Sequence, residues 1–170
     1  PGMPNVTGYE EGSSARYMPY YFVLTAIGQL FSFSPMQVMS LAGISNVILL
    51  CFSIQYFFKH YFQKPLAPLI GLIVFFCFWG TAWSWSNVYQ LRNLVYTACY
   101  HSSFTFALSL LSLGYIVSLL RQHSLSIIQL IAVVTLSFLM FVCHPLTGAF
   151  GIGAAGLLVL TYSSATLNQR

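Results

Sequence analysis

Long apolar runs dominate this sequence and decide what kind of fold it can adopt. A helix needs about 20 apolar residues to cross a bilayer core about 30 Å thick. Backbone polar groups in lipid must bond within their own segment, and the runs lack the alternating pattern of a membrane barrel, so helices are expected. Five runs meet or approach this length: 36–58, 66–85, 104–120, 125–143 and 146–162.

We therefore expect an all-α fold, a polytopic transmembrane helix bundle with about five spans over residues 34–170. The last run, 146–162, is short and rich in glycine, which lets another helix approach closely. A sixth apolar run, 17–33, carries Pro19 and Gln29 and is marginal in length. We expect it to form an interfacial or short membrane helix.

Composition supports a membrane protein and excludes several other classes. The chain is 58% hydrophobic and 5% charged, whereas soluble proteins carry roughly a quarter charged residues. Its only acidic residues are Glu10 and Glu11, too few for an acidic two-metal site. Its six Lys and Arg residues are too widely spread to neutralise a run of phosphates, so we expect no nucleic-acid partner. Pro1 opens the sequence without a basic n-region, and we expect the chain to be part of a longer protein.

The positions of the cations predict an orientation. If the run 36–58 crosses from the outer face to the cytoplasm, four cations fall on the cytoplasmic side, and only Arg16 and Arg92 lie outside. Excess Lys and Arg is typical of cytoplasmic loops. We therefore expect a multi-pass integral membrane protein whose remaining polar chemistry lies on the non-cytoplasmic face. The four cytoplasmic cations are Lys59, Lys64, Arg121 and Arg170.

Residues 1–16 are predicted to form an outer polar loop that contains both acids. Glu10 and Glu11 can act as a general base or as metal ligands, because a carboxylate is the usual proton acceptor for a hydroxyl. The alternative is that both are solvated loop charges.

The segment 86–103 is predicted to contain an outer interfacial helix. Arg92, Tyr96 and Tyr100 recur at helical spacing along one stripe. Arginine gives forked hydrogen bonds to a phosphate, and tyrosine offers a stacking face and a hydroxyl to a sugar. The alternative is simple anchoring of Tyr and Arg at the lipid headgroups.

Two histidines lie at predicted outer ends of spans. His101 follows the outer helix, and His144 precedes Pro145. Ionisable groups at the membrane edge suggest a functional site, and His144 can orient a phosphate or pass a proton. The alternatives are a histidine that ends its helix by bonding a neighbouring carbonyl and, as a minor option, haem ligation by both histidines. The four cysteines are scattered singly, which supports neither a zinc site nor a redox motif.

The order of these features resembles the GT-C class of multi-spanning glycosyltransferases. The segment YMPYYFVL from Tyr17 is similar to the family pattern H-P-P-L-Y-Y-x-L, and the break Ser34-Pro35 with a long span follows. HPLT, from His144, resembles a His-Pro turn of some relatives. Tyr17 and Met18 replace the family's His and first Pro. The family's first span and its acidic residue, the expected catalytic base or metal ligand, would lie before Pro1, and Glu10 and Glu11 are candidates to replace that residue.

This resemblance implies transfer of a sugar from a polyprenyl-phosphate carrier to an outer-face acceptor. Glu10 or Glu11 would then activate the acceptor hydroxyl or hold a divalent cation. A transporter or lipid flippase segment, or a noncatalytic membrane subunit bound to other membrane subunits, remains the alternative; membrane lipids are partners in every case. The residues expected to bind phosphate or substrate are Arg16, Tyr17, Arg92, Tyr96, Tyr100, His101 and His144.

Overall fold

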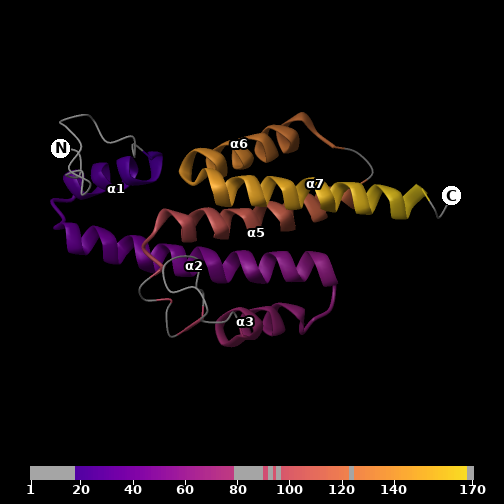
Figure 1. Cartoon of the computed structure of the whole chain (residues 1–170), viewed down its shortest axis with the longest axis horizontal. Helices are drawn as coiled ribbons and strands as arrows, with labels where there is room; N and C mark the ends of the chain where they lie inside the picture. The colour runs from indigo at the N-terminus through magenta and orange to yellow at the C-terminus, as the bar shows by residue number, and fades with distance from the viewer. Residues whose placement is uncertain (1–17, 79–89, 92–93, 95–96, 123–124, 168–170) are drawn as a thin grey trace.

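The computed structural model describes residues 18–78, 90–91, 94, 97–122 and 125–167. Every regular element within these ranges is an α-helix, which confirms the expected all-α fold. Figure 1 shows the helices lying side by side along one long axis. The helices are α1 (Pro19–Leu30), α2 (Pro35–Phe62), α3 (Ala67–Phe78), α5 (His101–Leu120), α6 (Ile127–Cys143) and α7 (Pro145–Leu167).

Local sequence signals explain where most of these helices begin. Ser34 caps α2 through a reciprocal pair of bonds: its Oγ accepts from the backbone N–H of Gln37 at 3.4 Å, and its own N–H donates to the Gln37 side chain at 2.8 Å. Such a capping box satisfies two backbone donors that the first turn leaves free. Ser126 caps α6 in the same manner. Pro35 occupies the first turn of α2, where its missing N–H costs nothing.

Among the described residues, three helices are long and apolar enough to cross a membrane: α2, α5 and the part of α7 from Pro145 to Tyr162. The other two predicted spans correspond to shorter apolar helices, α3 and α6. The predicted span 66–85 continues beyond Phe78 into residues outside the described ranges. At about 1.5 Å per residue, the 12 residues of α1 cannot cross the bilayer core as a helix.

Helix α5 lies at the centre of the bundle. It packs against α2, α6 and α7, and it has the largest buried share of the three candidate spans. Leu50 and Ile54 of α2 meet Ala107 and Leu110 of α5 in the main apolar core. Because α5 begins at His101, residues 101–103 belong to this helix and not to the outer helix expected over 86–103.

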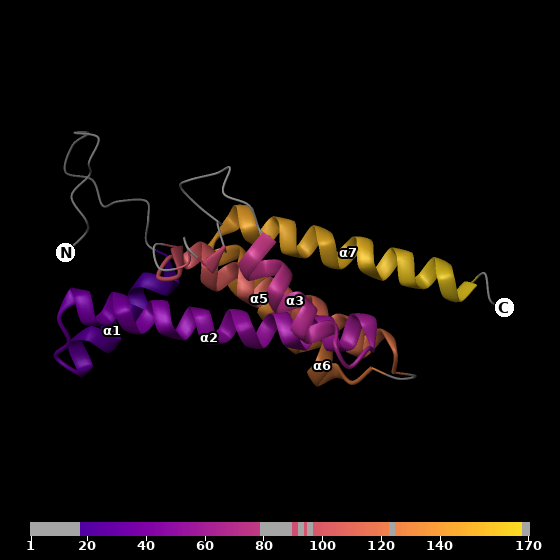
Figure 2. The same ribbon diagram turned by 90° about the horizontal axis from the view of Figure 1, so that it is seen from below.

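Two glycines of α7 allow this helix to approach its neighbours closely. A Cβ on Gly148 would lie 2.7 Å from the backbone carbonyl atoms of Met140, and one on Gly151 would lie 2.5 Å from Ser109 Oγ. The glycine-rich run of α7 therefore packs tightly in its first turns, as small residues at helix interfaces do. Gly153 and Gly156 have nothing within 4 Å of an added Cβ. In Figure 2 the C-terminal half of α7 stands away from α2.

The bundle has two chemically different ends. His101 begins α5 and Arg121 follows its last residue, so the two lie about 30 Å apart along a 20-residue helix. Arg121 Nη2 donates to the carbonyl oxygen of Tyr61 at 3.2 Å, which joins the C-terminal ends of α5 and α2. The end that carries Lys59, Lys64 and Arg121, the three cations among the described residues, is called the basic pole.

Candidate functional site

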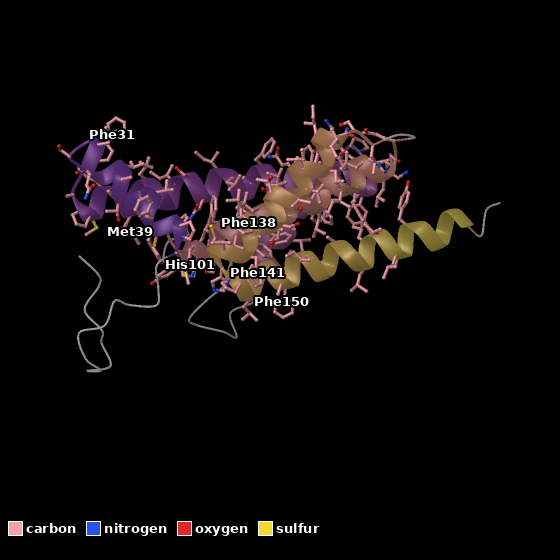
Figure 3. The ribbon with its side chains drawn as sticks, turned by 90° about the horizontal axis from the view of Figure 1, so that it is seen from above. Phe31, Met39, His101, Phe138, Phe141 and Phe150 are labelled. Atoms are coloured by element: carbon pink, nitrogen blue, oxygen red, sulfur yellow. The ribbon has the colours of Figure 1, made fainter. Side chains whose placement is uncertain are left out.

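The opposite end, called the polar pole, is built where four parts of the chain meet: the start of α1, the first half of α2, the start of α5 and the turn between α6 and α7. Figure 3 shows His101 at this end, close to the start of α7. The pole comprises Tyr20, Tyr21, Asn46, His101, His144 and Thr147.

Asn46 fixes the backbone that leads into α5. This side chain is only 4% exposed. Its Nδ2 group donates to the carbonyl oxygen of Ala98 at 2.7 Å and to the hydroxyl oxygen of Tyr20 at 2.8 Å. The Tyr20 hydroxyl in turn donates to the carbonyl oxygen of Cys99 at 3.2 Å. These bonds connect α1 and α2 to the segment just before His101 and so fix where α5 begins.

Tyr21 contacts His101 directly. The Tyr21 hydroxyl oxygen lies 2.9 Å from His101 Nδ1, within hydrogen-bonding distance, and the two rings meet edge to face with centroids 5.3 Å apart. The backbone of His101 also accepts a bond from the Thr105 hydroxyl at 2.9 Å. The histidine ring is therefore oriented from α1, whereas its backbone is fixed within α5.

The two histidines predicted for the outer face are in contact. The ring centroids of His101 and His144 lie 4.9 Å apart, with an angle of 45° between the ring planes. The first histidine comes from α5 and the second from the turn between α6 and α7. This direct contact leaves no room for a macrocycle between the rings, which argues against haem ligation by the pair.

His144 caps the start of α7 through its side chain. Its Nδ1 atom accepts a hydrogen bond from the backbone N–H of Thr147 at 3.2 Å and lies 2.7 Å from the Thr147 hydroxyl oxygen. This is the position at which a capping side chain satisfies a free donor of the first turn. The alternative that His144 ends its helix by bonding a neighbouring carbonyl describes its backbone, whose N–H donates to the Met140 carbonyl oxygen at 3.0 Å, whereas the partner of Nδ1 is an N–H group.

Burial changes the acid–base properties of two groups in the polar pole. It lowers the pKa of His144 below the usual value, because the partly buried imidazolium loses solvation. It raises the pKa of Tyr20 to about 12, and the hydrogen bond from Asn46 offsets part of that rise. Both side chains are therefore neutral near pH 7.

The structure describes three of the nine predicted site residues. His101 and His144 lie in the polar pole, and Tyr100 immediately precedes α5 with 45% of its surface exposed. The remaining predictions lie outside the described residues: Glu10, Glu11, Arg16, Tyr17, Arg92 and Tyr96.

Sequence reasoning missed four residues of the polar pole. Tyr20 and Tyr21 belong to the family-like segment but carried no predicted role. Asn46 is an amide deep inside the apolar run 36–58, and that depth was the available signal, because polar groups at membrane depth usually have a partner. Thr147 follows His144 by three residues, the spacing of a helix cap.

A metal centre has no support among the described residues, since they contain no group of three or more His, Cys, Asp or Glu side chains that could hold an ion. The four cysteines, all within the described residues, are free thiols. Comparison with protein-family models, with curated proteins and with solved structures finds no match to this chain.

Proposed function

We propose that this chain is part of a multi-pass membrane glycosyltransferase that takes a sugar from a polyprenyl-phosphate carrier at the non-cytoplasmic face. The observation that carries the proposal is the contact between His101 and His144, with Tyr21 against it, at the end opposite Lys59 and Lys64. Since excess cations favour the cytoplasmic side, this arrangement favours an outward-facing polar pole.

The polar pole has suitable chemistry for a phosphate-linked sugar. Imidazole N–H groups donate to phosphate oxygens. The exposed ring of Tyr100 can stack on a sugar, as aromatic rings with a polar end do at binding surfaces. Surrounding apolar helices would accommodate the lipid tail of the carrier.

The remaining roles belong to residues outside the described ranges. We propose that Arg16 and Arg92 supply the positive charge that stabilises the leaving phosphate, a role that preorganised cations perform well. Glu10 or Glu11 would accept the proton of the acceptor hydroxyl. Tyr17 and Tyr96 would line the sugar site.

The test is sugar transfer by the full-length protein in lipid nanodiscs, with a radiolabelled polyprenyl-phosphate sugar as donor. We expect the double variant His101→Ala/His144→Ala to lower kcat/KM at least about 100-fold, because two groups that contact the substrate are removed. The matched control is His60→Ala. His60 is also half-buried, with Nδ1 2.8 Å from the carbonyl oxygen of Tyr56, but it lies at the basic pole.

The control should transfer sugar at the wild-type rate. Wild-type rates in the double variant, or equal losses in the double variant and in His60→Ala, would contradict the proposal. Replacement of Glu10 and Glu11 by Gln should abolish transfer and leave binding of the carrier intact.

A noncatalytic membrane subunit is the second candidate, and α7 favours it. Gly153 and Gly156 leave open space on this helix, and Leu157 and Leu160 are exposed beside them. Small residues on an open face allow a second helix to pack closely. Stability that depends on another membrane subunit, together with no binding of the lipid-linked sugar, would favour this candidate over the transferase.

A further inference from the structure

The bonding of His144 determines where its proton resides. A backbone N–H can only donate, so the 3.2 Å contact from Thr147 N requires Nδ1 to be an unprotonated acceptor. A neutral imidazole with a bare Nδ1 carries its hydrogen on Nε2. The Thr147 hydroxyl, 2.7 Å from the same Nδ1, can then donate as well, so both contacts agree with one tautomer.

The surroundings of His144 disfavour its protonation. A proton on Nδ1 would face the N–H of Thr147, and the start of a helix repels positive charge. The titratable groups on the elements packed around it are His101 on α5, Cys143 on α6, and Tyr20 and Tyr21 on α1. None of these is a carboxylate, so none of them supplies a negative charge to an imidazolium. The lowered pKa of His144 agrees with this geometry.

The same geometry disfavours a metal at His144. Ligation through Nε2 would move the hydrogen to Nδ1, where Thr147 already donates. Nδ1 itself is occupied by the helix cap. The Nε2–H group remains available to donate a hydrogen bond to a ligand. Among the described residues, no acceptor lies within hydrogen-bonding distance of that nitrogen.

We infer that His144 is a neutral hydrogen-bond donor, with its hydrogen on Nε2, to a phosphate oxygen of a polyprenyl-phosphate ligand at the polar pole. The identity of the ligand rests on the function proposed above. His144 then contributes a directional hydrogen bond to the phosphate, and other residues supply the positive charge. The two ring nitrogens have separate roles: Nδ1 caps α7, and Nε2 donates a hydrogen bond to the phosphate.

Two conservative variants separate these tasks. Asparagine places its amide near the position of Nδ1 and is a favoured helix cap, so His144→Asn keeps the cap and loses the Nε2 donor. Glutamine reaches the position of Nε2 with an N–H group, so His144→Gln keeps the donor and weakens the cap.

The first measurement is the ¹⁵N spectrum of the histidine-labelled full-length protein in nanodiscs, with the His144 signals identified by their loss in His144→Asn. We expect Nδ1 unprotonated and Nε2 protonated at neutral pH, and the ring should take up its second proton at a lower pH than an ordinary histidine does. A cationic His144 at neutral pH, or a neutral ring with its hydrogen on Nδ1, would overturn the inference.

The second measurement is binding of polyprenyl monophosphate in the nanodisc, followed by its ³¹P signal. We expect His144→Asn to weaken binding about tenfold and His144→Gln to stay within about threefold of wild type, as for loss and retention of one hydrogen bond to a charged group. Phosphatidylglycerol at the same charge density and inorganic phosphate should cause no shift of the Nε2 resonance.

The outcomes distinguish this inference from the proposed function. Binding that His144→Asn leaves unchanged overturns the inference, while the proposed function stands. A wild-type protein that does not bind the carrier overturns the ligand assignment and the proposed function together. In that case the nitrogen spectrum still decides the tautomer.

Discussion

The two ends of the bundle hold their polar groups in opposite ways. At the polar pole, Asn46 and Thr147 are buried, and their hydrogen-bond partners are neutral. At the basic pole, Lys59 and Lys64 are exposed, and Arg121 bonds a single carbonyl oxygen. Buried neutral bonds position chain segments, whereas exposed charges contribute little to stability. The comparison indicates that hydrogen bonds at the polar pole fix the positions of chain segments, whereas the charges of the basic pole contribute little to stability.

The largest expected effect comes from the contact between α6 and α7 beside His144. Gly148→Ala should lower the free energy of unfolding by about 3 kcal/mol, because the new methyl group would lie 2.7 Å from backbone atoms of Met140 that cannot move freely. Gly156→Ala, further along α7, should be neutral or stabilising by up to about 1 kcal/mol, since its Cβ meets open space and alanine favours helix. Denaturant titration of both variants in micelles measures the difference.

Equal destabilisation by Gly148→Ala and Gly156→Ala would contradict the difference in packing between the two halves of α7. It would mean that the first turns of α7 pack no more tightly than its far half.

The next effect concerns the amide that connects α2 to the start of α5. Asn46→Leu should lower the free energy of unfolding by about 2 kcal/mol, because the Ala98 carbonyl loses its bond and the Tyr20 hydroxyl loses its donor. Gln55→Leu, an exposed amide on the same helix, is the matched control and should change stability by less than about 0.5 kcal/mol. Thermal unfolding in nanodiscs provides the measurement. If the control loses as much as Asn46→Leu, the amide of Asn46 has no special role.

A smaller effect is a pH dependence that arises at the polar pole. Because the folded-state pKa of His144 is lowered, the unfolded chain binds more protons below about pH 6.5, and stability should fall as the pH drops from about 7 to 5. The slope should be shallower in His144→Asn, which has no titrating ring and retains a cap. Parallel stability curves for the two proteins across this range would show that His144 does not titrate as described.

The smallest effect is expected at the basic pole. Arg121→Gln removes a bond of 3.2 Å to the Tyr61 carbonyl that solvent competes for, so it should cost less than about 1 kcal/mol. The same unfolding assay, repeated in high salt, provides the check. A loss as large as that of Asn46→Leu would remove the distinction between the two poles.

Prolines at the breaks between the apolar runs predicted several helix boundaries, because such signals are local. Ser34-Pro35 begins α2, Lys64-Pro65 precedes α3, and His144-Pro145 separates α6 from α7. The start of α5 could not be read in this manner. Tyr100, at its cap position, makes no side-chain cap bond, and the turn before it is fixed by Asn46 from another helix.

The candidate site was predictable only in part. Placement of His101 and His144 at one end follows from the alternating direction of successive spans. Their ring contact, and the contact of Tyr21 with His101, depend on how α1 and the turn between α6 and α7 pack on α5. Side-chain spacing within one segment carries no information on such long-range pairs.

The central claim is that α5 crosses the membrane and separates the two poles. Its most direct test labels single cysteines at Tyr100→Cys and Gln122→Cys, exposed positions just before and just after α5, in a cysteine-free full-length protein in sealed, oriented vesicles. A membrane-impermeant maleimide added outside should modify position 100 at once and position 122 only after the membrane is opened. Modification of both positions from the same side of intact vesicles would contradict the account.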